Sequence, residues 1–143
     1  MIKRSSLLVV LCMSLLAACA SAPQASLQDF NGTWVVDMDA SHAVNPSLAE
    51  RNSIRDFMSQ VTMEIDVEQK QMTIISAEHE EKIALPFVIL AQQQNTLRIR
   101  IDDGADGGAA DEMIHLQLDG GQLIFKVTST PNNRDDFVFV RKP

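Results

Sequence analysis

The amino-acid sequence predicts an all-β protein, an antiparallel up-and-down barrel of about eight strands with one short helix in the first connection. Three observations support this prediction. Residues 30–37 (FNGTWVVD) place a Gly-x-Trp pair at the start of the first strand, where the glycine permits a sharp turn and the indole can plug a barrel end. Short segments after it alternate apolar and polar residues, as strands with one buried face do. The connections between them are alternately short and long, as expected of the two ends of a barrel.

The first 18 residues are typical of a targeting segment rather than of a folded domain. Lys3 and Arg4 form a basic start, and the apolar run that follows is too short to span a bilayer, which needs about 20 residues. The run ends on Leu16-Ala17-Ala18-Cys19, which resembles the lipobox of bacterial lipoproteins. The resemblance implies cleavage before Cys19, a diacylglycerol on its sulfur and an acylated amine. The alternative is an ordinary secretory signal peptide with a cysteine at its cleavage site.

The residue after the cysteine bears on where such a lipoprotein resides. Ala20 is not the aspartate associated with inner-membrane retention, so in a two-membrane bacterium the resemblance implies the periplasmic face of the outer membrane. Several acyl chains hold a protein durably there, because each buried methylene contributes about 0.8 kcal/mol. Residues 19–29 are mostly small and polar, with one proline. We therefore expect a lipidated N-terminus and flexible tether, followed by one barrel domain over residues 30–143.

Charge and cysteine content limit the possible partners. Loss of Lys3 and Arg4 with the signal leaves ten basic and nineteen acidic residues, a net charge of −9. This balance disfavours a nucleic-acid partner. Cys12 leaves with the signal and Cys19 is used for lipid, so no disulfide is available and stability must come from a packed core.

Eight segments are expected to be strands. The alternation is clean in several, as where Met63, Ile65 and Val67 alternate with polar residues. The fourth segment is apolar on both faces and contains Pro86, which predicts a bulge or an edge strand. The expected strands are residues 33–38, 61–67, 72–75, 83–90, 96–101, 113–118, 122–128 and 137–141.

The first connection follows a helical period. Asn45 supplies an N-cap and Pro46 suits the first helical position. Apolar residues then recur at a spacing of three and four, which predicts a helix over residues 46–60 that packs this stripe on the barrel. The stripe consists of Ile54, Phe57, Met58 and Val61.

The connections predict two different barrel ends. Connections two, four and six are short, at residues 68–71, 91–95 and 119–121, whereas the other four are longer. One end should therefore be tight and the other a loop-rich mouth. The first strand starts and the last strand finishes at the tight end, which brings Trp34 and Arg141 together.

At this point the chain resembles the lipocalin-like superfamily. The residues that carry the resemblance are Gly32-x-Trp34, opening the first strand, and Arg141 in the last strand. The resemblance implies a calycin-like barrel in which the arginine stacks on the tryptophan. Gly32, Trp34 and Arg141 would then build the closed end.

No group of residues predicts catalysis. Residues 102–112 (DDGADGGAADE) are rich in carboxylates but fail the register of an EF-hand, so a flexible acidic loop is the better interpretation. His42, His79 and His115 lie on separate elements, and no serine or cysteine nucleophile can be paired with one of them. We therefore expect no enzymatic activity, no cofactor and no metal site.

These observations favour a non-enzymatic, lipid-anchored envelope protein whose barrel binds a small apolar or amphipathic ligand. The alternative is a solid-cored interaction module that presents its acidic loops to a basic envelope protein. A cavity of several hundred cubic ångströms would favour the first, and a filled interior the second. The candidates for lining a ligand site are Trp34, Val36, Met63, Ile65, Leu85, Phe87, Ile99, Leu116 and Phe125.

The expected mouth is strongly acidic. Its connections hold many carboxylates and few basic residues. Such a field would favour cationic or cationic amphipathic ligands, divalent ions or a basic partner, and the attraction would weaken with salt. The alternative is that these carboxylates only keep the loops soluble. The acidic residues are Asp39, Glu50, Asp56, Glu78, Glu80, Glu81, Asp102, Asp103, Asp106, Asp111, Glu112, Asp135 and Asp136.

Overall fold

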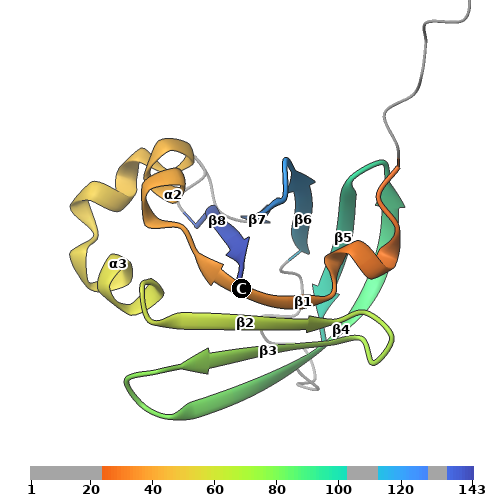
Figure 1. The fold of residues 1–143 in the computed structure, drawn as a ribbon, viewed down its shortest axis with the longest axis horizontal. Coiled ribbons are helices and arrows are strands. Elements are labelled where there is room, and N and C mark those ends of the chain that lie inside the picture. Colours follow the sequence, from red (N-terminus) through yellow and green to blue (C-terminus); the bar gives the residue numbers. More distant parts are fainter. Residues whose placement is uncertain (1–23, 103–112, 129–134) are drawn as a thin grey trace, which may run out of the picture.

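The structure, a computed structural model, describes residues 24–102, 113–128 and 135–143. Eight antiparallel strands close into an up-and-down barrel in which each strand pairs with its sequence neighbours and β1 pairs with β8 (Figure 1). The predicted fold class is confirmed. The strands are β1 (Gly32–Val36), β2 (Val61–Asp66), β3 (Gln71–Ser76), β4 (Glu81–Gln93), β5 (Thr96–Ile101), β6 (Met113–Asp119), β7 (Gln122–Val127) and β8 (Phe137–Arg141).

The first connection contains more helix than the sequence predicted. It holds two short α-helices, α2 (Met38–Val44) and α3 (Asn52–Met58), with the 3-10 helix η3 (Pro46–Glu50) between them. The expected single helix over residues 46–60 is therefore wrong. No helix in the described part of the chain is long and apolar enough to cross a membrane.

Two local features explain the correction. Strand β1 ends at Val36 because Asp37 caps α2, its side chain accepting a hydrogen bond from the Ala40 backbone N–H at 2.9 Å. Pro46 does begin a helical segment, as expected, but the chain leaves helical geometry at Arg51, with φ −115° and ψ 60°. That break divides η3 from α3.

Helix α2 covers the outer face of β8. The buried Ser41 hydroxyl accepts from the Val138 N–H at 2.8 Å and lies 3.2 Å from the Val138 carbonyl oxygen, to which it can donate. Asn45 Nδ2 donates to the Asp136 carbonyl oxygen at 3.2 Å. Val138, which would face solvent in a bare barrel, is consequently 2 % exposed. The first connection is thus fixed to the last strand.

The bend of β4 explains the role of Pro86. Residues 81–86 pair with β3, whereas residues 87–93 pair with β5, so the long strand changes partner at the proline. Proline has no N–H to donate to a ladder, and the change of partner is a place where none is needed. The predicted bulge lies further along the strand, between Ile89 and Ala91. The alternative prediction, an edge strand, is wrong because β4 pairs with both β3 and β5.

The closed end is built as predicted. The Arg141 guanidinium carbon lies 4.4 Å from the centroid of the Trp34 ring, and Trp34 is fully buried. Arg141 also donates to the backbone oxygens of Asp29 and Asn31, and Trp34 Nε1 donates to the Phe30 oxygen at 3.1 Å. These bonds hold the 3-10 helix η2 (Leu27–Phe30) across this end.

Gly32 is required by this arrangement. Its φ is +132°, and a Cβ placed there would come within 2.6 Å of Arg141 Nη1. A side chain would therefore both strain the backbone and displace the guanidinium from the tryptophan.

The two barrel ends differ in their connections, though less than expected. The β4–β5 and β6–β7 turns have two residues each, and Gly120 and Gly121 both have positive φ, as a tight hairpin requires. At the opposite end lie the helices and the β3–β4 turn (Figure 1). That turn is only four residues long, residues 77–80, because β3 and β4 extend further than predicted. The expectation that every mouth connection is longer is therefore wrong for this one.

The outer face of β5–β7 carries a row of basic side chains. Arg98 on β5, His115 on β6 and Lys126 on β7 are register partners on adjacent strands. Partial burial lowers the pKa of His115, and the positive charges of Arg98 and Lys126 lower it further. Like charges opposite one another on a sheet are destabilising.

Replacing His115 with glutamine should make the free energy of unfolding less dependent on pH. The fold holds the pKa of His115 below the unfolded value of about 6.5, so the folded state binds fewer protons and stability falls as the pH drops through that value. Glutamine cannot be protonated and removes this contribution. Urea unfolding at about pH 7.5 and about pH 5.5, on either side of that value, measures the change. An equal pH dependence in both proteins would contradict the prediction.

Candidate ligand-binding site

A cavity of about 540 Å³ opens at the mouth of the barrel. Its walls come from strands β2–β8 and from α3, and all but two of the lining side chains are apolar. The apolar lining residues are Ile54, Phe57, Met58, Val61, Met63, Met72, Ile74, Leu85, Ile101, Ile114, Phe125, Val127, Phe137 and Phe139.

The floor of the cavity is formed by residues halfway along the barrel. Met63 and Met72 are at most 1 % exposed, and the rings of Phe125 and Phe139 lie 6.3 Å apart at 57°. Thioethers adapt to different apolar shapes, because an unbranched side chain has several low-energy rotamers. The floor can therefore adjust to what lies above it.

Below this floor the interior is solid. Trp34, Leu97, Ile99, Leu116 and Leu123 are fully buried and belong to one core cluster. The interior thus has two halves, a packed half at the closed end and a hollow half at the mouth.

Helix α3 supplies one side of the entrance. Ile54 and Met58 are partly buried against the core, as the predicted stripe required, while Phe57 remains 43 % exposed. A large exposed aromatic ring next to an apolar cavity extends the apolar surface that a ligand would meet.

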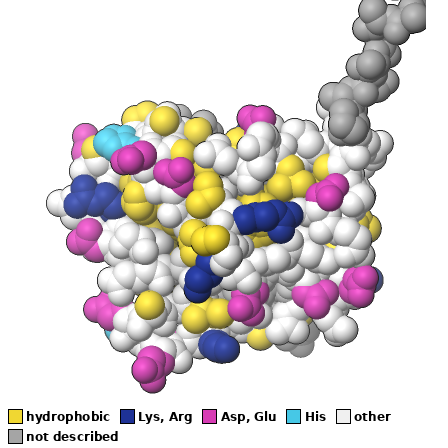
Figure 2. Space-filling model, in the orientation of Figure 1, with side chains coloured by type: hydrophobic (Ala, Val, Ile, Leu, Met, Phe, Trp, Pro, Cys, Tyr) yellow, Lys and Arg dark blue, Asp and Glu magenta, His cyan; other side chains and the backbone are white. Residues whose placement is uncertain are grey.

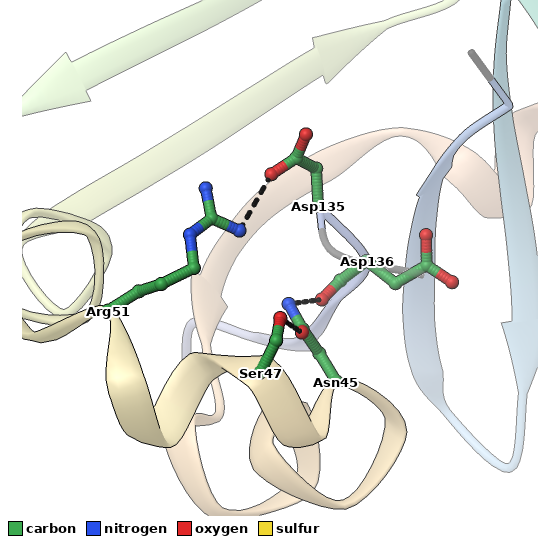
Figure 3. Close-up of polar contacts among 5 residues, drawn as sticks. All are labelled: Asn45, Ser47, Arg51, Asp135 and Asp136. Atoms are coloured by element: carbon green, nitrogen blue, oxygen red, sulfur yellow. Dashed lines mark hydrogen bonds and ion pairs between the residues drawn. The ribbon is translucent and has the colours of Figure 1, made fainter. Parts of the chain in front are cut away.

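One ion pair marks the rim. Arg51 Nη1 lies 3.0 Å from Asp135 Oδ1, and these are the two charged side chains that line the cavity in the described residues (Figure 3). Their side chains are 21 % and 38 % exposed. Both side chains are partly exposed at the rim, so the pair lies where a charged group of a ligand would meet it.

A hydrogen-bond network holds the Asp135 side of this pair. Ser47 Oγ donates to Asn45 Oδ1 at 2.8 Å, which orients the amide whose Nδ2 donates to the Asp136 oxygen (Figure 3). Burial raises the pKa of the Asp136 carboxyl, while Lys126 and the Val127 N–H act in the opposite direction. The segment before β8 is thereby tied to the helices, and Asp135 is presented to Arg51.

Three of the nine predicted lining residues line the cavity, and six do not. Met63, Leu85 and Phe125 line the cavity. Trp34, Ile65, Phe87, Ile99 and Leu116 are at most 3 % exposed and lie in the packed interior, so they do not reach it. Val36 is half-buried against the same core and is not part of the cavity wall.

The sequence-based choice missed the mouth-end residues. Ile74, Ile101, Ile114 and Val127 face inward at the ends of their strands nearest the mouth. Alternation showed that they face inward, but it does not show depth along the barrel axis. Counting each strand from its mouth end would have found them.

The predicted acidic mouth falls partly outside the described residues. Residues 103–112 and 129–134 are not described, so nine of the thirteen predicted acidic residues lie in the described part of the chain, and four, Asp103, Asp106, Asp111 and Glu112, lie outside it. On the face drawn in Figure 2, acidic side chains are spread singly or in small groups among basic and hydrophobic ones. Within residues 24–102, 113–128 and 135–143, no three His, Cys, Asp or Glu side chains come together in a way that could hold a metal ion.

The arrangement can hold an apolar body with one polar end. The walls and floor offer hydrocarbon and aromatic surface, and the rim offers one guanidinium and one carboxylate. Compared by sequence, the chain matches no known protein-family model and no curated protein. The cavity and its rim therefore carry the functional argument.

Proposed function

We propose that this is a non-enzymatic, lipid-anchored protein of the outer membrane, facing the periplasm, that binds a small apolar or amphipathic ligand in the mouth of its barrel. The observation that carries the proposal is the apolar cavity of about 540 Å³. Small-molecule sites fall between roughly 300 and 1,000 Å³ and have mainly apolar linings with a few polar groups. The cavity favours a carrier over a solid-cored interaction module.

The ligand would sit with its apolar part on the floor and its polar part at the rim. Burial of apolar surface supplies affinity at about 25 cal/mol per Å². A cationic head group would pair with the Asp135 carboxylate in place of the Arg51 guanidinium. This geometry suits the cationic amphipathic ligand expected from the acidic connections.

The anchor is proposed from the sequence. Leu16-Ala17-Ala18-Cys19 follows a basic start and a short apolar run, and Cys19 is the acylation site. The stack of Arg141 on Trp34, with Gly32 beside it, supports membership of the lipocalin-like superfamily.

Native mass spectrometry of the protein purified from its own envelope tests whether a ligand is carried. The expected result is the mass of the lipidated chain plus a small molecule that is released on unfolding. Protein that carries no adduct, and that also takes up no apolar probe when one is offered, would rule out the carrier function.

Replacing Ile74 with tryptophan should fill part of the cavity and weaken binding of the neutral apolar probe N-phenyl-1-naphthylamine by about ten-fold, a loss of about 1.4 kcal/mol. Ile74 lines the cavity from β3, so a larger ring there occupies ligand space. Ile75→Trp is the matched control, since the next residue of the strand points to the opposite face. Equal probe affinity in the two variants would place the ligand elsewhere.

A further inference from the structure

The row of basic side chains noted above belongs to a wider basic face. We define the basic face as Arg98, Arg100, His115 and Lys126, all on the outside of β5–β7. Their inward neighbours Leu97, Ile99, Ile114 and Leu116 are buried, which fixes the outward direction of the basic side chains. This concentration of positive charge occurs in a chain whose mature net charge is −9.

The rest of the described chain does not neutralise the two arginines. Arg98 and Arg100 are exposed, and within residues 24–102, 113–128 and 135–143 neither makes an ion pair with a carboxylate. Lys126 Nζ donates to Gln117 Oε1 at 3.0 Å, and Asp136 lies close enough to interact electrostatically with it. The arginines are thus available to an external anion.

Large apolar side chains accompany the charges. Leu90 is 40 % exposed at the bulge of β4, next to the register partner of Arg98. Met113 is 39 % exposed and is the register partner of Arg100. Cations interleaved with exposed apolar side chains match the interface of a bilayer, which offers phosphate oxygens above and hydrocarbon below.

The N-terminal segment reaches the barrel next to these strands. Gln92 Nε2 on β4 donates to the Ala25 oxygen at 2.7 Å, and Gln24 lies with the β4–β5 and β6–β7 turns around a surface pocket at the closed end. Residues 20–24 span at most roughly 18 Å when extended. Arg98 is two residues from the start of β5, which places it about 7 Å from the same end.

We infer that the basic face docks on an anionic phospholipid surface, so that the barrel lies with the outside of β4–β7 against the bilayer. The closeness of the tether depends on the proposed lipid at Cys19, whereas the charge and exposure of the face do not. In this orientation the mouth opens along the membrane rather than directly away from it.

The overall negative charge does not prevent this contact. Interactions between exposed charges are screened beyond about 8 Å at physiological ionic strength, and helix α2 packs on β8 rather than on the outside of β5 and β6 (Figure 1). Asp102 follows Arg100 by two residues and offsets part of its charge, whereas Arg98 lies further from that carboxylate along the strand. Each cation held near an anionic bilayer contributes roughly a five-fold increase in affinity. Removing two should therefore weaken docking by at least about ten-fold.

The test uses residues 19–143 with Cys19→Ala, so that no acyl chain contributes. Its sedimentation is measured with vesicles of phosphatidylethanolamine containing about one quarter phosphatidylglycerol, a common anionic mixture, and with neutral phosphatidylcholine vesicles. We expect salt-sensitive binding to the anionic vesicles only. Arg98→Gln with Arg100→Gln should weaken that binding at least about ten-fold without lowering the temperature of thermal unfolding, because both side chains are exposed and Arg98 faces other basic side chains.

The matched control removes two charges elsewhere. Arg55→Gln with Lys70→Gln alters exposed cations on α3 and in the β2–β3 turn and should leave vesicle binding as it was. An equal loss in both double variants would reduce the effect to net charge and overturn the inference. No binding to anionic vesicles would also overturn it, and binding to polyaspartate alone would assign the face to an acidic protein instead.

Discussion

Replacing Trp34 with alanine should lower the free energy of unfolding by about 3–5 kcal/mol, the range for removing a large buried ring. The indole is fully buried in the packed half of the barrel, and its register partners are Met63 on β2 and Arg141 on β8. The cavity left by the missing indole would lie beside the β1–β8 pairing that closes the barrel. The substitution also removes the hydrogen bond to the Phe30 oxygen, which helps to hold η2.

Urea unfolding followed by circular dichroism measures this loss, because Trp34 is the one tryptophan of the chain and its fluorescence disappears with it. Arg141→Gln and the double variant complete a cycle that isolates the stacking energy, expected at about 0.5–2 kcal/mol. A loss below about 1 kcal/mol for Trp34→Ala would contradict the view that this ring closes the barrel.

The strands and their order could be predicted because a barrel strand with one buried face alternates apolar and polar residues in its sequence. Leu97 and Ile99 are buried between exposed Arg98 and Arg100, and the register follows once each two-residue turn is recognised. The meeting of the first and last strands at the closed end could be predicted from the even number of strands. Eight antiparallel strands return the last strand to the end where the first began, which is why Trp34 and Arg141 could be paired.

The helices were harder because they depend on contacts distant in the sequence. Met38 continues the alternation of Trp34 and Val36 that predicted a strand to residue 38, yet Asp37 caps a helix there. Hydrogen bonds from Ser41 to Val138 and from Asn45 to Asp136 hold that helix. The signal of an aspartate cap was present but competed with the strand pattern. The break at Arg51, whose side chain contacts Asp135, has no local signal.

The site was half predictable for a related reason. Alternation identifies inward-facing residues such as Met63 and Phe87, but only their position along the axis decides which lines the cavity and which is packed below it. The basic face was not recognised because Arg98, Arg100, His115 and Lys126 lie on three strands. It appears only when their register is known.

Replacing Cys19 with alanine should move the protein from the outer-membrane fraction to the soluble fraction or leave an uncleaved precursor. Thioether acylation requires that sulfur, and each methylene buried in the bilayer is worth about 0.8 kcal/mol, so losing several acyl chains exceeds any other single change in membrane affinity. Cys12→Ala is the matched control, since the second cysteine of the chain lies inside the proposed signal and should be dispensable.

A high-salt wash in the same experiment distinguishes attachment through the lipid anchor from association through the basic face. Wild-type protein should stay with outer membranes through a wash at about 1 M salt, where the screening length is only about 3 Å, because acyl burial does not depend on charge. The Cys19→Ala chain should show only the weak association of Arg98 and Arg100, which that wash would remove. Its Trp34 fluorescence should match wild type, because the indole is buried within residues that the substitution does not touch. A Cys19→Ala protein of mature length that remains with the outer membrane after the wash would exclude lipidation as the anchor.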